Sequence, residues 1–552
     1  MKINMLPIIA KFLKAPPELA VALLLVVSLG GCASHESATS AAIQQRESEV
    51  ARFLSRSRSL SNTYETRLGL AVAAADLVSK DIAEGGKDKD RVLYNAACTE
   101  IAILSRHVTL PITLTTPGGV YEFALDPARA SNRWDPATFT KLIPTSKIKN
   151  KALPYKPSKA GYGGVLVGVY LPPNPRALYL PSIGVSAPVT AVLNTTPPAQ
   201  PGQPTRATLA LYNSAKVESA SIAGAKRKLA ADLTAPFAYY RPPSDMGILG
   251  MLRPDHSINQ EGLFLTQPYD PKKIPLVLIH GLMSDPSMWF PVMAALEADP
   301  ALRSKYQFWI FAYPSGNLIG YSALQLREAL AGMYKVYPQT RDMVIVNHSL
   351  GGVISHLQVI SPGETLVNAI FKDNAPEIMA MPDDSLVKRG LLFEANPRIA
   401  RIVFVAAPHR GAPLAINPIG NFGASLIRIP GQLINGIGQG VIQAAALADG
   451  KKANFIPNSI NGLSPKSPLL VAMNTVPMNP PFHSIIGVAG PIKGPLKKTN
   501  DTVVPYWSAH QDAAVSEKIV PYPHTAMFVK PKATDEIKRI LRLHLRSVGD
   551  GT

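Results

Sequence analysis

Apolar residues recur at helical spacing in the first part of the chain. Three such stretches lie between residues 43 and 106, and turn-forming residues such as Gly85-Gly86 separate them. The stretches are 44–60, 65–84 and 91–104. The pattern predicts a small helical module over residues 43–106.

From about residue 107 to 235 the apolar runs become short and β-rich. The clearest are 108–114, 118–123, 164–171, 207–212 and 216–222. Nine prolines fall within 172–204, and because proline lacks a backbone N–H we do not expect this stretch in the middle of a sheet. We predict a β-rich domain with Pro-containing connections, in which no chemistry is recognisable. Its protein partners, if it has any, are unknown.

Residues 236–552 alternate between short apolar runs and amphipathic stretches, which is typical of a parallel sheet with helical crossovers. Asp285 is expected to cap a helix over 287–298, and Thr534 to cap a final helix. A further helix is expected over 324–337. The predicted strands are 276–279, 308–312, 343–346, 402–405 and 484–488. The fold class is therefore α/β.

A serine follows one of these strands in a turn-like context. The segment reads Asn347-His348-Ser349-Leu350-Gly351-Gly352, and a helix is expected from Val353. A serine on a tight turn between strand and helix is exposed and lies beside a helix N-terminus, which is the geometry of a nucleophile elbow. Asn347 stands where the motif has glycine, and asparagine tolerates positive φ better than most residues.

About seventy residues upstream, the strand 276–279 is followed by His280-Gly281-Leu282. With Phe404–Gly411 and residues 482–545, this segment resembles bacterial α/β hydrolases of the lipase/esterase type, in particular lipoprotein members with an extra N-terminal region. The resemblance covers roughly the last 310 residues. It implies an α/β-hydrolase fold, a mostly parallel sheet with helices on both faces, over 236–552.

In that family the chain order is serine, acid, histidine. The resemblance implies Ser349 as nucleophile and His524, on the loop before the last helix, as base, with His510 as the alternative. The acid is implied to be Asp501, because Asn500–Pro505 resembles the family's Asp-Gly-Val-Val-Pro segment with Thr502 in place of glycine. Asp512 and Glu517 are the alternative acids.

The resemblance also implies an oxyanion hole made by the backbone N–H groups of Leu282 and Leu350. The residues implied to support this loop and the elbow are His280, Gly281, Asn347, His348 and Gly351. His280 is interpreted as orienting the loop and not as the base. The chemistry calls for no cofactor and no metal, and no metal-ligand cluster is visible in the sequence.

Two insertions are expected within the catalytic domain, at about 361–398 and 412–470. The second contains 420–447, which is rich in glycine and aliphatic residues and nearly uncharged. Either insertion could be a lid over an acyl pocket or a buried cap, and such an apolar stretch suits lipid-like ester substrates.

The N-terminus resembles a bacterial lipoprotein signal. Three lysines precede an apolar run at 20–29, which is too short to span a bilayer core of ~30 Å. Gly30-Gly31-Cys32 then resembles a lipobox, which predicts a signal peptide over 1–31, acylation of Cys32 and a tether over 32–42; an ordinary signal peptide is the alternative. Ala33 after the cysteine favours the outer membrane by family analogy. Cys98 is then an unpaired, buried structural thiol.

Composition adds the limits on function. The 552 residues hold 56 Lys and Arg against 38 Asp and Glu, a formal charge of +18, yet no nucleic-acid motif accompanies this charge. We interpret it as a basic protein held beside an anionic membrane. The leading hypothesis is a membrane-anchored serine hydrolase of carboxylic esters. The alternatives are a phospholipid deacylase or acyltransferase with the same triad, and a non-catalytic envelope lipoprotein with a degenerate hydrolase domain.

Overall fold

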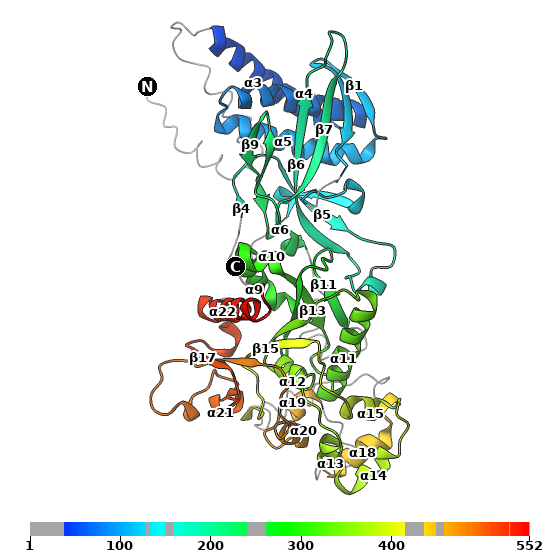
Figure 1. The fold of residues 1–552 in the computed structure, drawn as a ribbon, viewed down its shortest axis with the longest axis vertical. Helices are drawn as coiled ribbons and strands as arrows, with labels where there is room; N and C mark the ends of the chain where they lie inside the picture. The colour runs from blue at the N-terminus through cyan, green and yellow to red at the C-terminus, as the bar shows by residue number, and fades with distance from the viewer. Residues whose placement is uncertain are drawn as a thin grey trace, which may run out of the picture.

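The computed structural model describes residues 38–127, 132–148, 158–239, 261–413, 435–448, 458–528 and 530–550. The molecule is elongated, with the N-terminal part of the chain at one end and the C-terminal part at the other (Figure 1). Cys32 and the expected signal peptide lie outside the described ranges. Helix α3 starts at Ala38, so residues 38–42, expected to be part of a tether, are helical instead. Three of these five residues are alanine, the strongest helix former.

Three helices occupy the region in which the periodicity predicts them. They are α3 (Ala38–Ser57), α4 (Tyr64–Ala83) and α5 (Asp88–Leu104). Helix α4 begins where the Thr63 side chain accepts a hydrogen bond from the N–H of Thr66. Its residues from Leu68 to Asp76 are all buried, so α4 is enclosed on several sides and not on a single stripe.

A six-stranded sheet packs on these helices. In spatial order its strands are β1 (Ile112–Thr116), β2 (Gly119–Leu125), β7 (Thr205–Asn213), β6 (Val185–Thr196), β5 (Gly164–Tyr170) and β3 (Lys141–Pro144). Two small ribbons, β10 (Ala231–Asp232) with β4 (Ser158–Lys159) and β8 (Ser219–Ile222) with β9 (Ala225–Lys228), and the short α6 (Ala235–Tyr239) complete the unit. Helices and sheet share one hydrophobic cluster. The helical module and the β-rich domain expected from the sequence are therefore two layers of a single α+β unit.

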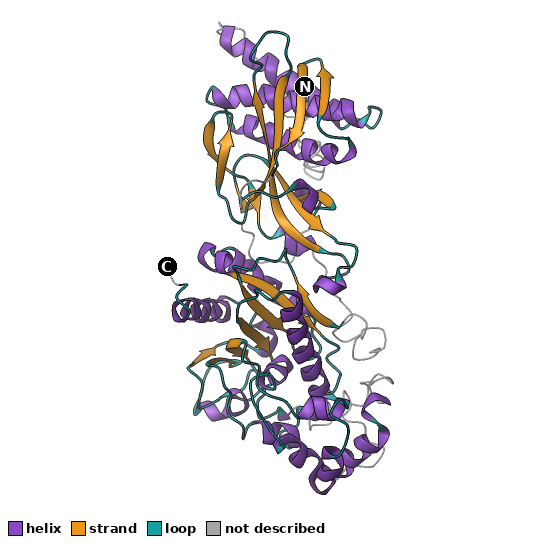
Figure 2. Cartoon of the chain, turned by 45° about the vertical axis from the view of Figure 1, so that its right-hand side comes forward, coloured by secondary structure: helices purple, strands orange, loops and turns teal. Residues whose placement is uncertain are grey.

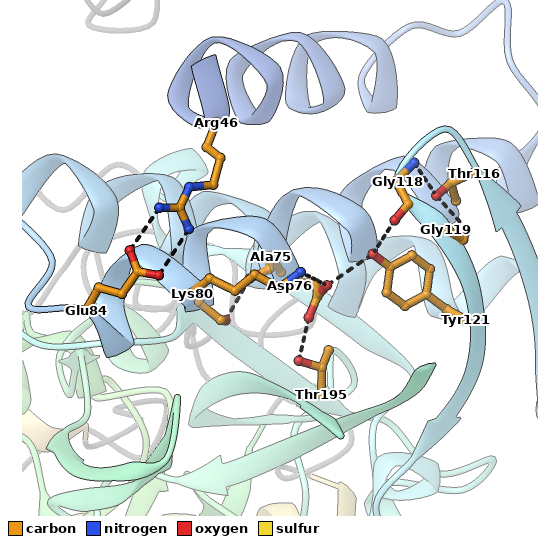
Figure 3. A network of polar contacts seen from close by, with 11 residues as sticks. Arg46, Ala75, Asp76, Lys80, Glu84, Thr116, Gly118, Gly119, Tyr121 and Thr195 are labelled. Atoms are coloured by element: carbon orange, nitrogen blue, oxygen red, sulfur yellow. Dashed lines mark hydrogen bonds and ion pairs between the residues drawn. The ribbon is translucent and has the colours of Figure 1, made fainter. Parts of the chain in front are cut away.

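Polar contacts also join the two layers (Figure 3). The buried carboxylate of Asp76 on α4 accepts hydrogen bonds from Tyr121 Oη on β2, at 3.2 Å, and from Thr195 Oγ1 on β6, at 2.6 Å. Within the helical layer, Arg46 on α3 forms an ion pair with Glu84 at the end of α4, with 2.8 Å between Nη2 and Oε2. A buried carboxylate needs such partners, so Asp76 favours this one packing of helix on sheet.

Strand β6 contradicts the expectation that the proline-rich stretch stays out of a sheet. It lies between β7 and β5 and contains Pro188. Pro188 pairs in register with Val167 on β5, but β7 begins to pair only at the next residue. The Pro188 carbonyl accepts a hydrogen bond from Trp134 Nε1 and so points away from β5. An N–H on this residue would point to the same side, where β7 does not yet pair, so no sheet hydrogen bond is lost because proline lacks it.

The C-terminal part contains a seven-stranded sheet (Figure 2). Its spatial order is β11 (Gly262–Leu265), β13 (Tyr306–Ala312), β12 (Ile274–Ile279), β14 (Met343–His348), β15 (Ile399–Val405), β16 (Phe482–Gly487) and β17 (Ser516–Val520). All neighbours are parallel except β11, which runs antiparallel to β13. The five predicted strands are confirmed. The two edge strands, β11 and β17, were not predicted, because short edge strands carry little periodicity.

Helices cover both faces of this sheet, which confirms the α/β class. Along β12, Val277 and Ile279 join a cluster with α11 (Ile319–Val336) and α12 (Leu350–His356). Leu276 and Leu278 point to the other face. There they pack with α9 (Phe290–Glu297), α10 (Pro300–Lys305) and α22 (Pro531–Ser547).

Three helix starts in the C-terminal part differ from the prediction. One is α11, which begins at Ile319 and not at residue 324. Thr534 does not cap the last helix, because α22 begins at Pro531 and Thr534 is buried inside it. Proline suits the first helical position, where the missing N–H has no partner to lose. The helix after the serine begins at Leu350 and not at Val353. Asp285 does accept a hydrogen bond from the N–H of Ser287, as expected, but the first turn is a 3₁₀ helix (Pro286–Trp289).

The expected insertions fold as short helices where the structure describes them. Residues 361–398 hold α13 (Thr365–Phe371), α14 (Ala375–Met379) and α15 (Leu386–Leu391), and the second insertion holds α18 (Gln439–Ala448), α19 (Ser459–Gly462) and α20 (Pro468–Met473). Helix α13 packs against α18 and α20. Residues 414–434, which include much of the expected lid at 420–447, lie outside the described ranges. Among the helices that the structure describes, none has the length and hydropathy needed to cross a membrane.

The segment around residue 179 joins the two parts of the molecule. The N–H of Leu265 on β11 donates to the Tyr179 carbonyl at 2.8 Å, and Tyr337 Oη donates to the Leu178 carbonyl at 2.8 Å. The Tyr179 ring packs edge-on against Trp309 of β13. Leu180 is buried within the cluster on the α11 face. The N-terminal unit therefore contributes side chains to the core of the C-terminal part.

Candidate active site

Ser349 lies on a strained turn between β14 and α12. Its backbone has φ 53° and ψ −124°, outside the regions that residues with a Cβ prefer. Such a conformation costs ~1–3 kcal/mol and persists only where the surroundings hold it. Here the N–H of Ser349 donates to the Val405 carbonyl at the end of β15, at 3.0 Å. The strand–turn–helix arrangement that the sequence predicts around Ser349 is present.

Two glycines let this turn pack against its neighbours. A Cβ on Gly351 would lie 2.5 Å from the His280 carbonyl oxygen, so a side chain there would separate α12 from the end of β12. A Cβ on Gly352 would lie 2.9 Å from Asn347 Oδ1 and closer still to Ala407. Gly352 thus leaves space for the Asn347 side chain.

The structure does not support the expected explanation for Asn347, which was that asparagine tolerates a positive φ. Asn347 does not have a positive φ; it is a regular strand residue, paired with Ile279 on β12 and Phe404 on β15. Its side chain is fully buried against Gly352. Space at Gly352, and not the tolerance of asparagine for positive φ, explains why this residue can replace the usual glycine.

The loop after β12 lies directly against the serine turn. A Cβ on Gly281 would come within 2.9 Å of His348 Nδ1 and 3.0 Å of Ser349 Cβ. The next residues, Leu282 and Met283, follow the same turn, and the Met283 N–H donates to Ser315 Oγ at 3.1 Å. Leu350 is the first residue of α12, where backbone N–H groups have no intrahelical partner. The two segments implied to form an oxyanion hole are therefore adjacent.

His280 is fixed beneath this loop. Its ring is fully buried and stacks on Tyr313, with 4.3 Å between centroids, and Tyr313 Oη donates to the His280 carbonyl at 2.8 Å. Burial lowers the pKa of His280 to about 4, so the ring is neutral at pH 7. These contacts agree with the expected orienting role. Tyr313 was missed in the sequence, although an aromatic residue directly after a buried strand is a usable signal.

Asp501 and His524 follow strands β16 and β17 and meet at the carboxyl ends of the parallel strands, as Ser349 does after β14. His524 Nδ1 lies 2.7 Å from Asp501 Oδ2, and both residues are buried. Asp501 Oδ1 accepts hydrogen bonds from the N–H groups of Val503, at 3.0 Å, and Val504, at 2.7 Å. The N–H of His524 also donates to the Asp501 carbonyl, at 2.7 Å. Main chain and side chains together fix the imidazole relative to the carboxylate.

The ring of His348 connects this pair to the serine turn. His348 directly precedes Ser349, and its ring lies 4.5 Å, centroid to centroid, from that of His524. On another side it meets the ring of Phe528 edge-on at 4.5 Å. Burial lowers the pKa of His348 well below its usual value, so it adds no charge beside His524. Phe528 was missed in the sequence, because only the tertiary fold brings it to this site.

His510, the alternative base, belongs to a separate cluster. His510 directly follows the short helix α21 (Tyr506–Ala509), and its Nδ1 lies 2.6 Å from Glu517 Oε2 on β17. Its Nε2 lies 3.0 Å from Asp512 Oδ1. The alternative acids Glu517 and Asp512 therefore contact His510, and among the described residues the carboxylate that contacts the His524 ring is that of Asp501.

The remaining histidines after Ser349 are buried in other surroundings. His356 and His409 pair through their Nδ1 atoms at 3.2 Å, and His483 Nε2 lies 2.7 Å from Arg401 Nη1. Burial lowers the pKa of His356 to about 3 and those of His483 and His544 to about 4. Within the described ranges, no group of three or more His, Cys, Asp or Glu side chains could hold a metal ion.

Comparisons with known proteins give distant structural likenesses. No protein-family model and no curated protein sequence matches this chain. It is similar to the mature form of the lipase BlEst2 from Bacillus licheniformis, with 16% identity, a TM-score of 0.29 and coverage of 50% of this chain and 97% of that one. It is also similar to the esterase Pf2001 of Pyrococcus furiosus, with 11% identity, a TM-score of 0.26 and coverage of 50% and 84%.

A third likeness is to esterase 2 of Thermogutta terrifontis in its apo form. The identity is 11% and the TM-score 0.28, over 52% of this chain and 90% of that one. At these values none of the three likenesses bears on the activity of this chain.

Proposed function

We propose that this protein is a serine hydrolase of carboxylic esters, of the lipase or esterase type, with Ser349 as nucleophile, His524 as base and Asp501 as acid. The observation that carries the proposal is the buried 2.7 Å contact between His524 Nδ1 and Asp501 Oδ2, beside the ring of His348, which precedes Ser349. A carboxylate on Nδ1 holds the proton there and leaves Nε2 free to accept one.

The reaction follows from these roles. His524 Nε2 takes the proton of Ser349 Oγ as this oxygen bonds to the ester carbonyl carbon. The tetrahedral intermediate then expels the alcohol, which receives the proton from His524, and Ser349 is left acylated. Water, deprotonated by His524, attacks the acyl-enzyme and releases the acid. Asp501 stabilises the imidazolium in both steps and takes no proton.

The oxyanion of each tetrahedral intermediate would rest on the backbone N–H groups of Leu282 and Leu350. The close approach of Gly281 to Ser349 supports this assignment, because it brings the loop after β12 beside the first turn of α12. Each such donor typically contributes about 3 kcal/mol to stabilisation of the transition state. The strained Ser349 turn and the fixed His280 keep these groups in position before substrate binds.

Labelling by a fluorophosphonate probe tests the triad. The probe forms a covalent bond with an activated serine, so we expect labelling of the wild type and its loss in Ser349→Ala and His524→Ala. His510→Ala is the matched control, since it removes the other carboxylate-bound histidine and is expected to leave labelling intact. A folded wild type that resists the probe would favour a non-catalytic envelope protein.

The substrate class is proposed to be lipid-like esters. Apolar side chains of the second insertion, among them Ile437 and Val441, pack against the core on the α11 face. p-Nitrophenyl esters of short and long acyl chains test this: we expect higher kcat/KM for long chains. A uniform preference for acetate would restrict the proposal to a short-chain esterase.

We also propose that the protein is anchored in the bacterial envelope, on the outer membrane, through acylated Cys32. The support is the lipobox-like sequence before this cysteine. Incorporation of an alkyne-tagged palmitate in wild type, and its absence in Cys32→Ala, is the expected result. Labelling of both forms would show that any acylation lies elsewhere.

A further inference from the structure

A cavity of about 310 Å³ lies where the two parts of the molecule meet. Its walls come from the segment around Tyr179 in the N-terminal unit, from β11 and β13, and from α11. Its apolar lining residues are Leu263 and Phe311, which pair across β11 and β13 on one face of the sheet, and Phe264, whose side chain lies on the other face. Its polar lining residues are Arg176, Tyr179, Glu261, Gln325 and Glu328. The cavity has room for a small organic molecule with one apolar part and one polar part.

Glu261 is the unusual group in this lining. Only 6% of the residue is exposed, and Glu261 Oε1 is buried without a hydrogen-bond partner in the part of the chain that the structure describes. A carboxyl group buried in this way costs free energy unless a donor reaches it. No such donor is needed for the proposed ester hydrolysis, so this group is unexplained by the reaction.

The neighbouring charges are already engaged. Arg176 donates from Nη2 to the main-chain carbonyl of Glu261, and its guanidinium lies over the ring of Phe264, 5.3 Å from the centroid. Glu328 forms an ion pair with Arg389. Among the described residues, Glu261 Oε1 therefore lacks a hydrogen-bond donor, and an N–H donor with positive charge would satisfy this carboxyl group best.

We propose that this cavity binds a small organic cation, an alkylammonium whose N–H donates to the carboxylate of Glu261 and whose short apolar chain packs on Leu263 and Phe311. The site is independent of Ser349, so the proposal goes beyond the ester hydrolase and stands or falls separately from it.

Binding of a cation here is coupled to release of a proton from Glu261. Burial raises the pKa of Glu261 to about 8, while Arg176 opposes the rise. The other titratable groups near it are Tyr313 and Tyr321, whose pKa values are raised by burial, and two further residues that line the cavity, Tyr179 and Glu328. Burial also raises the pKa of Tyr179. At pH 7 the carboxyl is therefore mostly protonated, and the ammonium must displace that proton into solvent to form its ion pair.

Isothermal titration calorimetry of the whole protein with n-butylammonium tests the site. Alkylammonium ions stay protonated to about pH 9, as lysine does. With a Glu261 pKa of about 8, the ionised fraction rises about tenfold from pH 7 to pH 9, so we expect the apparent affinity to rise about tenfold and about one proton to be released at pH 7. The uncharged n-butanol is expected to bind at least tenfold more weakly.

Glu261→Gln keeps the shape and removes the charge, so it is expected to abolish binding and its dependence on pH. Glu122→Gln, an exposed change on β2, is the matched control and should bind as wild type does. Equal binding by Glu261→Gln, or preferential binding of butyrate that strengthens as the pH falls, would overturn the proposal. If Glu261→Gln does not fold, the pH dependence and the choice between butylammonium and butyrate in wild type decide alone.

Discussion

Two histidine–carboxylate pairs, whose histidines lie fourteen positions apart in the sequence, differ in what surrounds them. His524 with Asp501 is buried, and His510 with Glu517 is partly exposed. Both contacts are short, 2.7 Å and 2.6 Å between nitrogen and oxygen. Both carboxylates also accept a second donor, from backbone N–H groups at Asp501 and from Tyr506 Oη at Glu517.

The other side of each imidazole makes the difference. His510 Nε2 is already bound to Asp512 at 3.0 Å, whereas the ring of His524 lies against His348, next to the strained Ser349. A histidine held by a carboxylate is thus not by itself a catalytic base. It also needs a free nitrogen, a fixed nucleophile and exclusion of water.

The largest effect is expected from removing the negative charge of Asp501, and the same change at Glu517 is the matched control. Asp501→Asn would no longer hold the His524 proton on Nδ1, and we expect kcat to fall by about 10³–10⁴-fold. Glu517→Gln makes the same chemical change at His510 and is expected to leave kcat/KM within about threefold. Steady-state kinetics on one ester measures both. If the two variants lost activity equally, our assignment of the acid would be wrong.

A smaller effect is expected at the loop that faces Ser349. Gly281→Ala would bring a Cβ to within 2.9 Å of His348 Nδ1 and 3.0 Å of Ser349 Cβ. The displaced loop should lower kcat/KM by about 10–100-fold, because catalytic groups misplaced by an ångström lose rate on this scale. Gly320→Ala in α11, where the nearest atom is 3.9 Å from the new Cβ, is the control. Wild-type activity in Gly281→Ala would argue against this loop as part of the oxyanion hole.

Next comes the strained residue beside Asp501. Thr502 has φ 86°, in the region that favours glycine, and it is exposed. Thr502→Gly should raise the free energy of unfolding by about 1 kcal/mol and leave kcat unchanged, because relief of strain outweighs the flexibility gained by the unfolded chain. Urea denaturation measures this. Thr499→Gly, at φ −87°, should destabilise the protein, and a loss of stability in both variants would contradict the strain at Thr502.

The smallest effect concerns pH and His510. Hydrogen bonding to Glu517, with further help from Asp512, raises the pKa of His510 above its usual value. A raised pKa stabilises the folded protein fully below the unfolded value of about 6.5, and this contribution is lost as the pH rises through the folded value.

Because a third of the His510 side chain is exposed, we expect less than about 1 kcal/mol from it. Thermal unfolding of wild type and His510→Asn at pH 6 and pH 8.5 measures the effect: the advantage of wild type should shrink at the higher pH. An advantage that grows with pH would mean that the pKa is lowered and not raised. Activity should be unaffected in either case.

Much of the fold could be predicted from local pattern. The five inner strands of the C-terminal sheet and the three N-terminal helices follow from runs of apolar residues, because each buries a whole face or strip of the element. The errors lie where burial comes from distant partners. The sequence pattern predicted two modules for the N-terminal helices and strands, whereas their side chains form one shared core. Pro188 fits within β6 because β7 ends beside it.

The sequence by itself determined the glycines of the serine turn and the α/β class, since these depend on backbone geometry and short-range periodicity. The choice of Ser349, Asp501 and His524 in that order came from the resemblance to a known family. Only the tertiary structure decided which histidine meets which carboxylate and that Asn347 fits because Gly352 leaves space for it. It also decided that Glu261 Oε1, at the junction of the two parts, is buried with no hydrogen-bond partner among the described residues. The physical reason is that hydrogen bonds, burial and pKa depend on neighbours in space, and for these residues the neighbours come from segments far apart in the chain.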